Sequence, residues 1–197
     1  MSAPATLAAS GARNAPVPAR YTPHPSVIPE GGCVCIIGMA GAGKTTVGRE
    51  LAALLGWPQL DTDHVIEATY GVRLQAIADS MSKEEFLDLE GTVISRLNVR
   101  RCVVSTGGSA AYRSHAIAHL KSLGPMVHLS VPLPVILERI ARKPERGLAI
   151  NPGQTVEDLF YEREALYKAA ADMTILGGNG PAAGYAEDIA RLLAEPR

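Results

Sequence analysis

Residues 38–45 read Gly-Met-Ala-Gly-Ala-Gly-Lys-Thr, directly after the apolar run Cys-Val-Cys-Ile-Ile at 33–37. They fill every fixed position of the phosphate-binding pattern G-x-x-x-x-G-K-[ST], and residues 46–55 continue as a helical pattern. A buried strand, a glycine-rich turn and a helix form the setting in which this loop binds phosphates, because its backbone N–H groups and the helix N-terminus both face the anion. The sequence therefore predicts binding of ATP or GTP.

Individual residues of this loop have distinct predicted roles. The Lys44 ammonium would reach the β- and γ-phosphates, where it would also be catalytic, and the Thr45 hydroxyl would ligate the Mg²⁺ that bridges them. The loop positions predicted to hold the nucleotide are Gly38, Gly41, Ala42, Gly43, Lys44, Thr45 and Thr46.

Composition limits the classes of protein to which the chain can belong. Its 197 residues are 47% hydrophobic, which suits one well-buried domain, placed at 31–197. A net charge of −1 argues against a nucleic-acid partner, and no apolar run approaches the roughly 20 residues that cross a bilayer. We expect a cytoplasmic monomer whose three cysteines stay reduced, and whose partner is a small molecule. Residues 1–30, rich in Ala and Pro, are expected to form a flexible or loosely docked tail.

The order of apolar and helical patterns predicts the fold class. Strand-like runs lie at 33–37, 57–61, 101–105, 125–131 and 173–176. Helical patterns separate these runs, and strands that alternate with helices form a parallel sheet with helices on both faces. Ligands of such α/β folds bind at the carboxyl ends of the strands. Polar or glycine-rich turns follow three of the predicted strands, at 38–45, 61–63 and 106–109. We expect these turns to meet in one cleft.

Two carboxylates follow the second predicted strand. Phosphoryl transfer depends on positioning and charge neutralisation, so an acidic residue near the phosphate loop should hold the hydration shell of Mg²⁺. Asp61 is predicted for this metal site. Asp63 would project toward the acceptor and bind or deprotonate its hydroxyl.

The order and spacing of these motifs resemble the shikimate kinase family from about residue 38 to residue 174. The segments that carry the resemblance are Gly-Lys-Thr-Thr-Val-Gly-Arg at 43–49, Asp61-Thr62-Asp63, Phe86 with Glu90, Thr106-Gly107-Gly108 and Arg163-Glu164-Ala165-Leu166-Tyr167. The resemblance implies a P-loop kinase fold with a five-stranded sheet. It also implies ATP-dependent phosphorylation of shikimate to 3-phosphoshikimate, a step of aromatic amino-acid biosynthesis.

The same resemblance implies further site residues. Arg139 and Arg146 have the spacing of the family's lid arginines, around a lid at 142–153, and both are expected to bind ATP, Arg146 also as a catalytic residue. Arg163 would fork onto the acceptor carboxylate in a bidentate pair. The remaining predicted acceptor-binding positions are Gly107, Gly108 and Ser109.

Three departures from the family pattern concern the acceptor site and the lid. Leu87 stands where the family has a second carboxylate-binding arginine, Ser109 replaces a third glycine, and Gly147 replaces a lid proline. Unless Arg73 or Arg113 supplies the missing charge, the pocket has one guanidinium for the acceptor. The acceptor is therefore shikimate or another small hydroxy acid or hydroxy amino acid, such as homoserine, whose ammonium a second arginine would repel.

Two other classes fit the sequence less well. A nucleotide kinase would need a larger and more basic acceptor region than residues 64–100 provide. A binding module without activity should have lost Lys44, Thr45 or one of the aspartates, and all of them are present.

Overall fold

The computed structural model describes residues 20–142, 148–151 and 153–196. Its centre is a parallel sheet of five strands, ordered β2-β3-β1-β4-β5. The strands are β1 (Val34–Ile37), β2 (Gln59–Asp61), β3 (Val103–Ser105), β4 (Met126–Ser130) and β5 (Met173–Leu176). The predicted α/β class is confirmed, and the strands lie within the five predicted runs.

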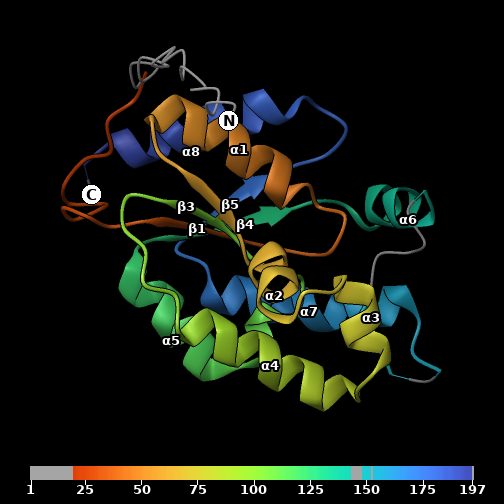
Figure 1. Ribbon diagram of the computed structural model, residues 1–197. Helices are drawn as coiled ribbons and strands as arrows, with labels where there is room; N and C mark the ends of the chain where they lie inside the picture. Colours follow the sequence, from red (N-terminus) through yellow and green to blue (C-terminus); the bar gives the residue numbers. More distant parts are fainter. Residues whose placement is uncertain (1–19, 143–147, 152, 197) are drawn as a thin grey trace, which may run out of the picture.

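Helices cover both faces of this sheet (Figure 1). They are α1 (Lys44–Leu55), α2 (Thr62–Tyr70), α3 (Leu74–Asp79), α4 (Lys83–Ser95), α5 (Ser114–Leu123), α6 (Leu133–Ala141), α7 (Val156–Ala170), α8 (Ala182–Ala194) and the short 3-10 helix η1 (Ala110–Tyr112). Helices α1 and α8 pack together on one face, and α4, α5 and α7 lie on the other. The apolar core lies between these layers, and all four residues of β1 are buried in it.

Two glycine positions show why the phosphate loop has its shape and its place. Gly43 precedes α1 with φ +100°, a left-handed conformation that side chains rarely adopt. Gly48, within α1, lies so near β3 that a Cβ atom there would be 2.4 Å from Oγ of Ser105. The first helix is therefore held tightly against the sheet, with its N-terminus at the end of β1.

The order of the strands brings the predicted site turns together. Strands β2, β3 and β1 are neighbours and run in the same direction, so their carboxyl ends lie at one edge of the sheet. The phosphate loop follows β1, Asp61 ends β2, and Thr106 follows β3. The three turns expected to meet are thus adjacent.

The described part of the N-terminal segment, residues 20–30, contacts the helices of the domain. The backbone N–H groups of Arg20 and Tyr21 donate to the Leu54 carbonyl, and that of His24 donates to Leu193, both in helices of the domain. Ile28 is buried in the core. Residues 20–30 are thus packed on α1 and α8, because their few apolar side chains have a surface to cover. The rest of the expected tail, residues 1–19, lies outside the described residues.

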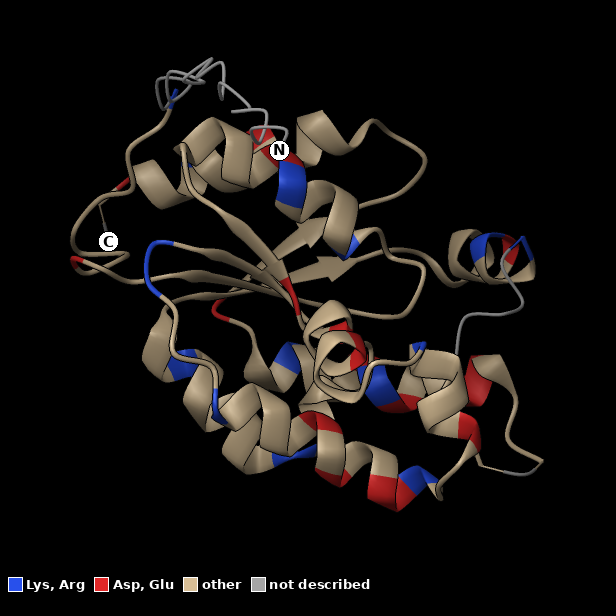
Figure 2. Cartoon of the chain, viewed as in Figure 1, with Lys and Arg blue, Asp and Glu red and all other residues tan. Residues whose placement is uncertain are grey.

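Charged side chains lie mainly on the helices and turns, with both signs interspersed in the view of Figure 2. Within the described ranges, no helix combines the length and apolar character needed to cross a membrane.

Candidate active site

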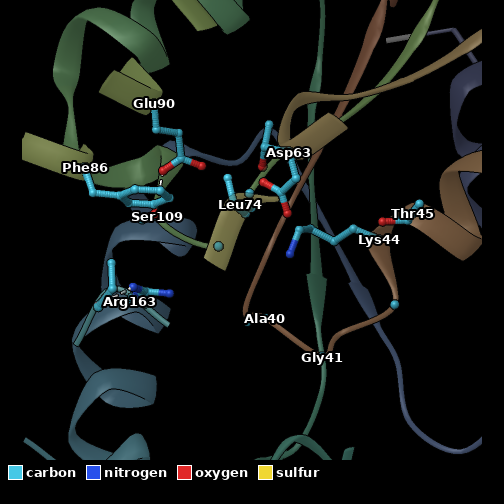
Figure 3. A pocket seen from close by; sticks show the side chains of 15 residues that line it. Ala40, Gly41, Lys44, Thr45, Asp63, Leu74, Phe86, Glu90, Ser109 and Arg163 are labelled. Atoms are coloured by element: carbon cyan, nitrogen blue, oxygen red, sulfur yellow. Dashed lines mark hydrogen bonds between the residues drawn. The ribbon is translucent and has the colours of Figure 1, made fainter. Parts of the chain in front are cut away.

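A pocket lies where the three turns meet (Figure 3). Its walls come from the phosphate loop, from helices α1, α2, α3, α4 and α7, and from the turn after β3. The lining residues are Ala40, Gly41, Gly43, Lys44, Thr45, Asp63, Leu74, Phe86, Glu90, Thr106, Gly107, Gly108, Ser109, Ala149 and Arg163. The structure therefore brings the end of the phosphate loop and every predicted acceptor residue to one pocket.

The phosphate-loop end of the pocket presents a cation and a pair of oxygen atoms. Lys44 is buried, and its Nζ donates to the carbonyls of Gly38 (2.7 Å) and Met39 (3.0 Å). The Thr45 hydroxyl donates to Oδ2 of Asp61 (2.6 Å). These two oxygen atoms, one hydroxyl and one carboxylate, are ligands of the kind that Mg²⁺ takes alongside water and phosphate oxygens.

Two carboxylates line the pocket beside bare backbone, Asp63 near Lys44 and Glu90 farther from the phosphate loop (Figure 3). Asp63 lies in the first turn of α2, where its N–H donates to Oδ1 of Asp61 (3.0 Å). Glu90 comes from α4 and is 1% exposed. A Cβ atom on Gly107 would lie 2.0 Å from Oε1 of Glu90 and 2.6 Å from Oδ1 of Asp63. The two carboxylates therefore converge on Gly107, whose N–H is held by the Thr62 hydroxyl (2.9 Å).

Arg163 supplies the guanidinium on the α7 side of the pocket. It is 2% exposed, and it donates from Nη2 to the Ala149 carbonyl (2.9 Å) and from Nε to the Tyr112 hydroxyl (3.4 Å). Its Nη1 would lie 3.0 Å from a Cβ atom on Gly108. Tyr167 on the same helix donates to the Gly108 carbonyl. The Tyr112 and Tyr167 hydroxyls thus hold the arginine and the turn in place.

The charge on Glu90 depends on its unusual surroundings. Burial raises the pKa of this carboxyl, and the nearby Asp63 charge raises it further. Hydrogen bonding from the Ser109 hydroxyl to Oε2 (2.5 Å) and the charges of Arg163 and Lys44 lower the pKa, so that it lies at about 7. Glu90 is one of the residues that carry the family resemblance, but the sequence alone assigns it no role. Its place at four-residue spacing between Phe86 and Ile94, on the apolar face of the helical pattern, was the available signal.

A second pocket adjoins the phosphate loop on its other side. It shares Gly41 and Gly43 with the first pocket and is also lined by Ala42, Thr46, Val47, Arg139, Arg142, Gly180, Ala182 and Tyr185. Arg139 donates from Nη1 to the carbonyls of Gly41 and Ala42 (both 3.1 Å) and from Nη2 to that of Gly178 (2.5 Å). It thereby ties the loop to the turn before α8.

Part of the predicted lid lies outside the described residues. Arg146 and Gly147 are among the residues that the structure does not describe. Residues 148–151 are described. Ala149 lines the first pocket, and its carbonyl accepts a hydrogen bond from Arg163.

Arg73 and Arg113, the other possible sources of positive charge for the acceptor, both lie outside the pocket. Arg113 pairs with Glu84 and Asp88, each at 2.7 Å, and Arg73 lies 3.7 Å from Glu67. Neither arginine lines the pocket. Leu87 is 2% exposed and does not line it either. Among the described lining residues, Lys44 and Arg163 are thus the only cations.

Comparisons with known proteins agree with this arrangement. A family model described as shikimate kinase matches residues 40–194. A shikimate kinase of Nitratidesulfovibrio vulgaris is 37% identical over 169 residues, which are 82% of this chain and 95% of the relative. Among solved structures, shikimate kinase from Acinetobacter baumannii in complex with shikimate is similar with a TM-score of 0.77 and 33% identity, covering 85% of this chain and 94% of that one. Shikimate kinase from Aquifex aeolicus has a TM-score of 0.66 and 28% identity, with 82% and 95% covered. The chain therefore belongs to the shikimate kinase family.

Proposed function

We propose that this chain transfers the γ-phosphoryl group of ATP to a hydroxyl of shikimate, forming 3-phosphoshikimate for aromatic amino-acid biosynthesis. The observation that carries the proposal is a single pocket in which Lys44 and Thr45 face Asp63 and Arg163. That pocket joins a phosphate site to a site for a small hydroxylated carboxylate. The similarity to an enzyme solved with shikimate supports the choice of acceptor.

ATP would lie across the phosphate loop. Its base would occupy the second pocket, between Arg139 and Tyr185, and its γ-phosphate would point into the acceptor pocket beside Lys44. Arg139 already braces the loop carbonyls, and Arg146 would add positive charge from the lid. Mg²⁺ would be held by Thr45 and, through water, by Asp61, and it would neutralise charge on the phosphates.

The acceptor would lie against Gly107 and Gly108. Its carboxylate would form a forked pair with Arg163, which leaves its hydroxyl near Asp63. In the reaction the acceptor oxygen forms a bond to the γ-phosphorus, the bond from phosphorus to the β,γ-bridging oxygen breaks, and the hydroxyl proton passes to Asp63. Lys44 stabilises the charge on the transferred group.

Two properties of the whole protein complete the proposal. The three cysteines, Cys33, Cys35 and Cys102, are buried free thiols, which suits a reducing cytoplasm. A small-molecule kinase of this type carries both substrate sites on one chain, so we propose that it works as a monomer without nucleic-acid or membrane partners.

One observation favours a second candidate, a hydroxy amino acid such as homoserine. Asp63 and Glu90 both line the pocket, in which Arg163 supplies the one guanidinium among the described lining residues. An ammonium group would find a carboxylate partner there, and shikimate has no such group.

Measurement of kcat/KM with shikimate, homoserine and related hydroxy acids, by ADP release, tests the proposal. Shikimate should be the best acceptor, and Arg163→Lys should raise its KM by roughly 10²-fold, because lysine cannot form the fork. Arg49→Lys, an exposed change on α1, is the matched control. Preference for homoserine would instead support the second candidate, and turnover with neither would contradict both.

A further inference from the structure

Glu90 is a buried carboxylate for which the proposed transfer has no use. It reaches the acceptor pocket from α4, with Oε1 turned to Gly107 and Oε2 held by Ser109. Figure 3 shows its carboxylate between Ser109 and the side of the pocket where Asp63 lies. Burying an ionisable group at a binding site costs free energy, so its charge state should affect what the site binds.

The charged neighbours of Glu90 act in opposite directions on the ionisation of its carboxyl group. Asp63 on α2 is the like charge that opposes ionisation, while Arg163 on α7 and Lys44 on α1 favour it. The Tyr167 hydroxyl, also on α7, stays protonated because burial raises its pKa. The Ser109 hydroxyl is the one hydrogen-bond donor recorded for the Glu90 carboxylate within the described residues.

We propose that Ser109 and Glu90 form a proton-binding pair that sets how tightly the pocket holds a carboxylate-bearing acceptor, with Ser109 as a positioning residue that acts through Glu90. This inference rests on the proposed function, because it assumes that Arg163 receives the acceptor carboxylate. When Glu90 is neutral, the Arg163 charge is available to the acceptor. When Glu90 is ionised, its charge competes for Arg163 and repels the acceptor carboxylate.

The direction of the pH dependence follows from this competition. The pKa of Glu90 is about 7, so the neutral form dominates below that pH and the ionised form above it. A bound acceptor carboxylate favours the neutral form and raises the pKa further, so binding takes up a proton around pH 7 to 8. Affinity for the acceptor should therefore be full in mildly acidic solution and fall as the pH rises through about 7.

The Ser109 hydroxyl determines where this transition lies. It donates to the carboxylate and thereby favours the charged form, so Ser109→Ala should raise the pKa of Glu90 and move the loss of affinity to higher pH. Glu90→Gln keeps the shape of the side chain but is neutral at every pH. It should bind the acceptor with an affinity that no longer changes in this range.

The experiment is calorimetric titration of shikimate into wild type, Ser109→Ala, Glu90→Gln and the control Glu50→Gln between about pH 6 and pH 9. Glu50 is exposed on α1, so the control removes the same charge away from the pocket. In wild type the Kd should rise about tenfold, with proton uptake that two buffers of different ionisation enthalpy reveal. In Ser109→Ala the midpoint of this rise in Kd should move to higher pH. In Glu90→Gln the pH dependence of the Kd should vanish, whereas in Glu50→Gln it should remain. The same pH dependence in Glu90→Gln as in wild type would overturn the inference.

Absence of shikimate binding at every pH would contradict the proposed function instead. Carbon-13 NMR of the Glu90 carboxyl then decides the claim about the pair without any ligand. A titration midpoint near 7 that rises in Ser109→Ala supports it. A midpoint in the ordinary carboxyl range, or one that Ser109→Ala leaves in place, overturns it.

Discussion

Replacing Asp63 by asparagine tests the proposed division of labour between the two aspartates. Asparagine has the same size but cannot take the hydroxyl proton, so kcat should fall roughly 10²–10⁴-fold, the range for a positioned general base. This loss corresponds to about 3–5 kcal/mol of transition-state stabilisation. ATP binding should change little, because the Asp63 backbone N–H donates to the metal-site residue Asp61, and the substitution keeps that contact.

The structure also predicts a secondary effect of this substitution. The Asp63 charge raises the pKa of Glu90, so Asp63→Asn should lower that pKa toward its ordinary range. Asp188→Asn, an exposed change on α8, serves as the control.

The assay is ADP release coupled to NADH oxidation, with KM measured separately for ATP and for shikimate. A folded Asp63→Asn protein with near-normal kcat would refute the role of Asp63 in proton transfer. A large rise in the KM for ATP with kcat preserved would mean that Asp63, and not Asp61 alone, belongs to the metal site.

Three other substitutions have defined outcomes. Lys44→Ala should lose several orders of magnitude in kcat while circular dichroism stays unchanged, because the charge on the transferred phosphoryl group is no longer stabilised; near-normal turnover would count against the site. Gly107→Ala should lower kcat/KM for the acceptor by roughly 10²-fold, because the new Cβ would lie 2.0 Å from Oε1 of Glu90 and displace the carboxylate. Unchanged acceptor kinetics would show that the acceptor does not bind against this turn. Leu87→Arg should tighten shikimate binding about tenfold through a second charge-assisted contact, because an arginine at 87 would lie one helical turn from Glu90. Weaker shikimate binding at preserved thermal stability would mean that the arginine side chain does not reach the pocket.

Much of the fold could be predicted because it depends on local patterns. Short strand-like runs separated by helical patterns identified all five strands, and the glycine-rich loop fixed the carboxyl end of β1. The packing of residues 20–30 depends instead on contacts with α1 and α8, far away in the sequence. Composition alone does not reveal a partner surface of that kind.

The site was predictable where one motif carries both position and chemistry, as in Lys44, Thr45 and the Asp61–Asp63 pair. The pairing of Ser109 with Glu90 was not, since it joins α4 to the turn after β3 and only the folded chain brings them within 2.5 Å. Arg113 illustrates the converse. Its charge left it as a candidate for the acceptor site, but two carboxylates on α4 hold it outside the pocket.

Product analysis tests the central claim most directly. The purified protein is incubated with ATP, Mg²⁺ and shikimate, and the products are followed by phosphorus-31 NMR together with mass spectrometry. The account predicts one phosphate monoester of shikimate, esterified at the 3-hydroxyl, formed in equal amount to ADP by wild type and not by Lys44→Ala. Release of inorganic phosphate with shikimate recovered unchanged would contradict it.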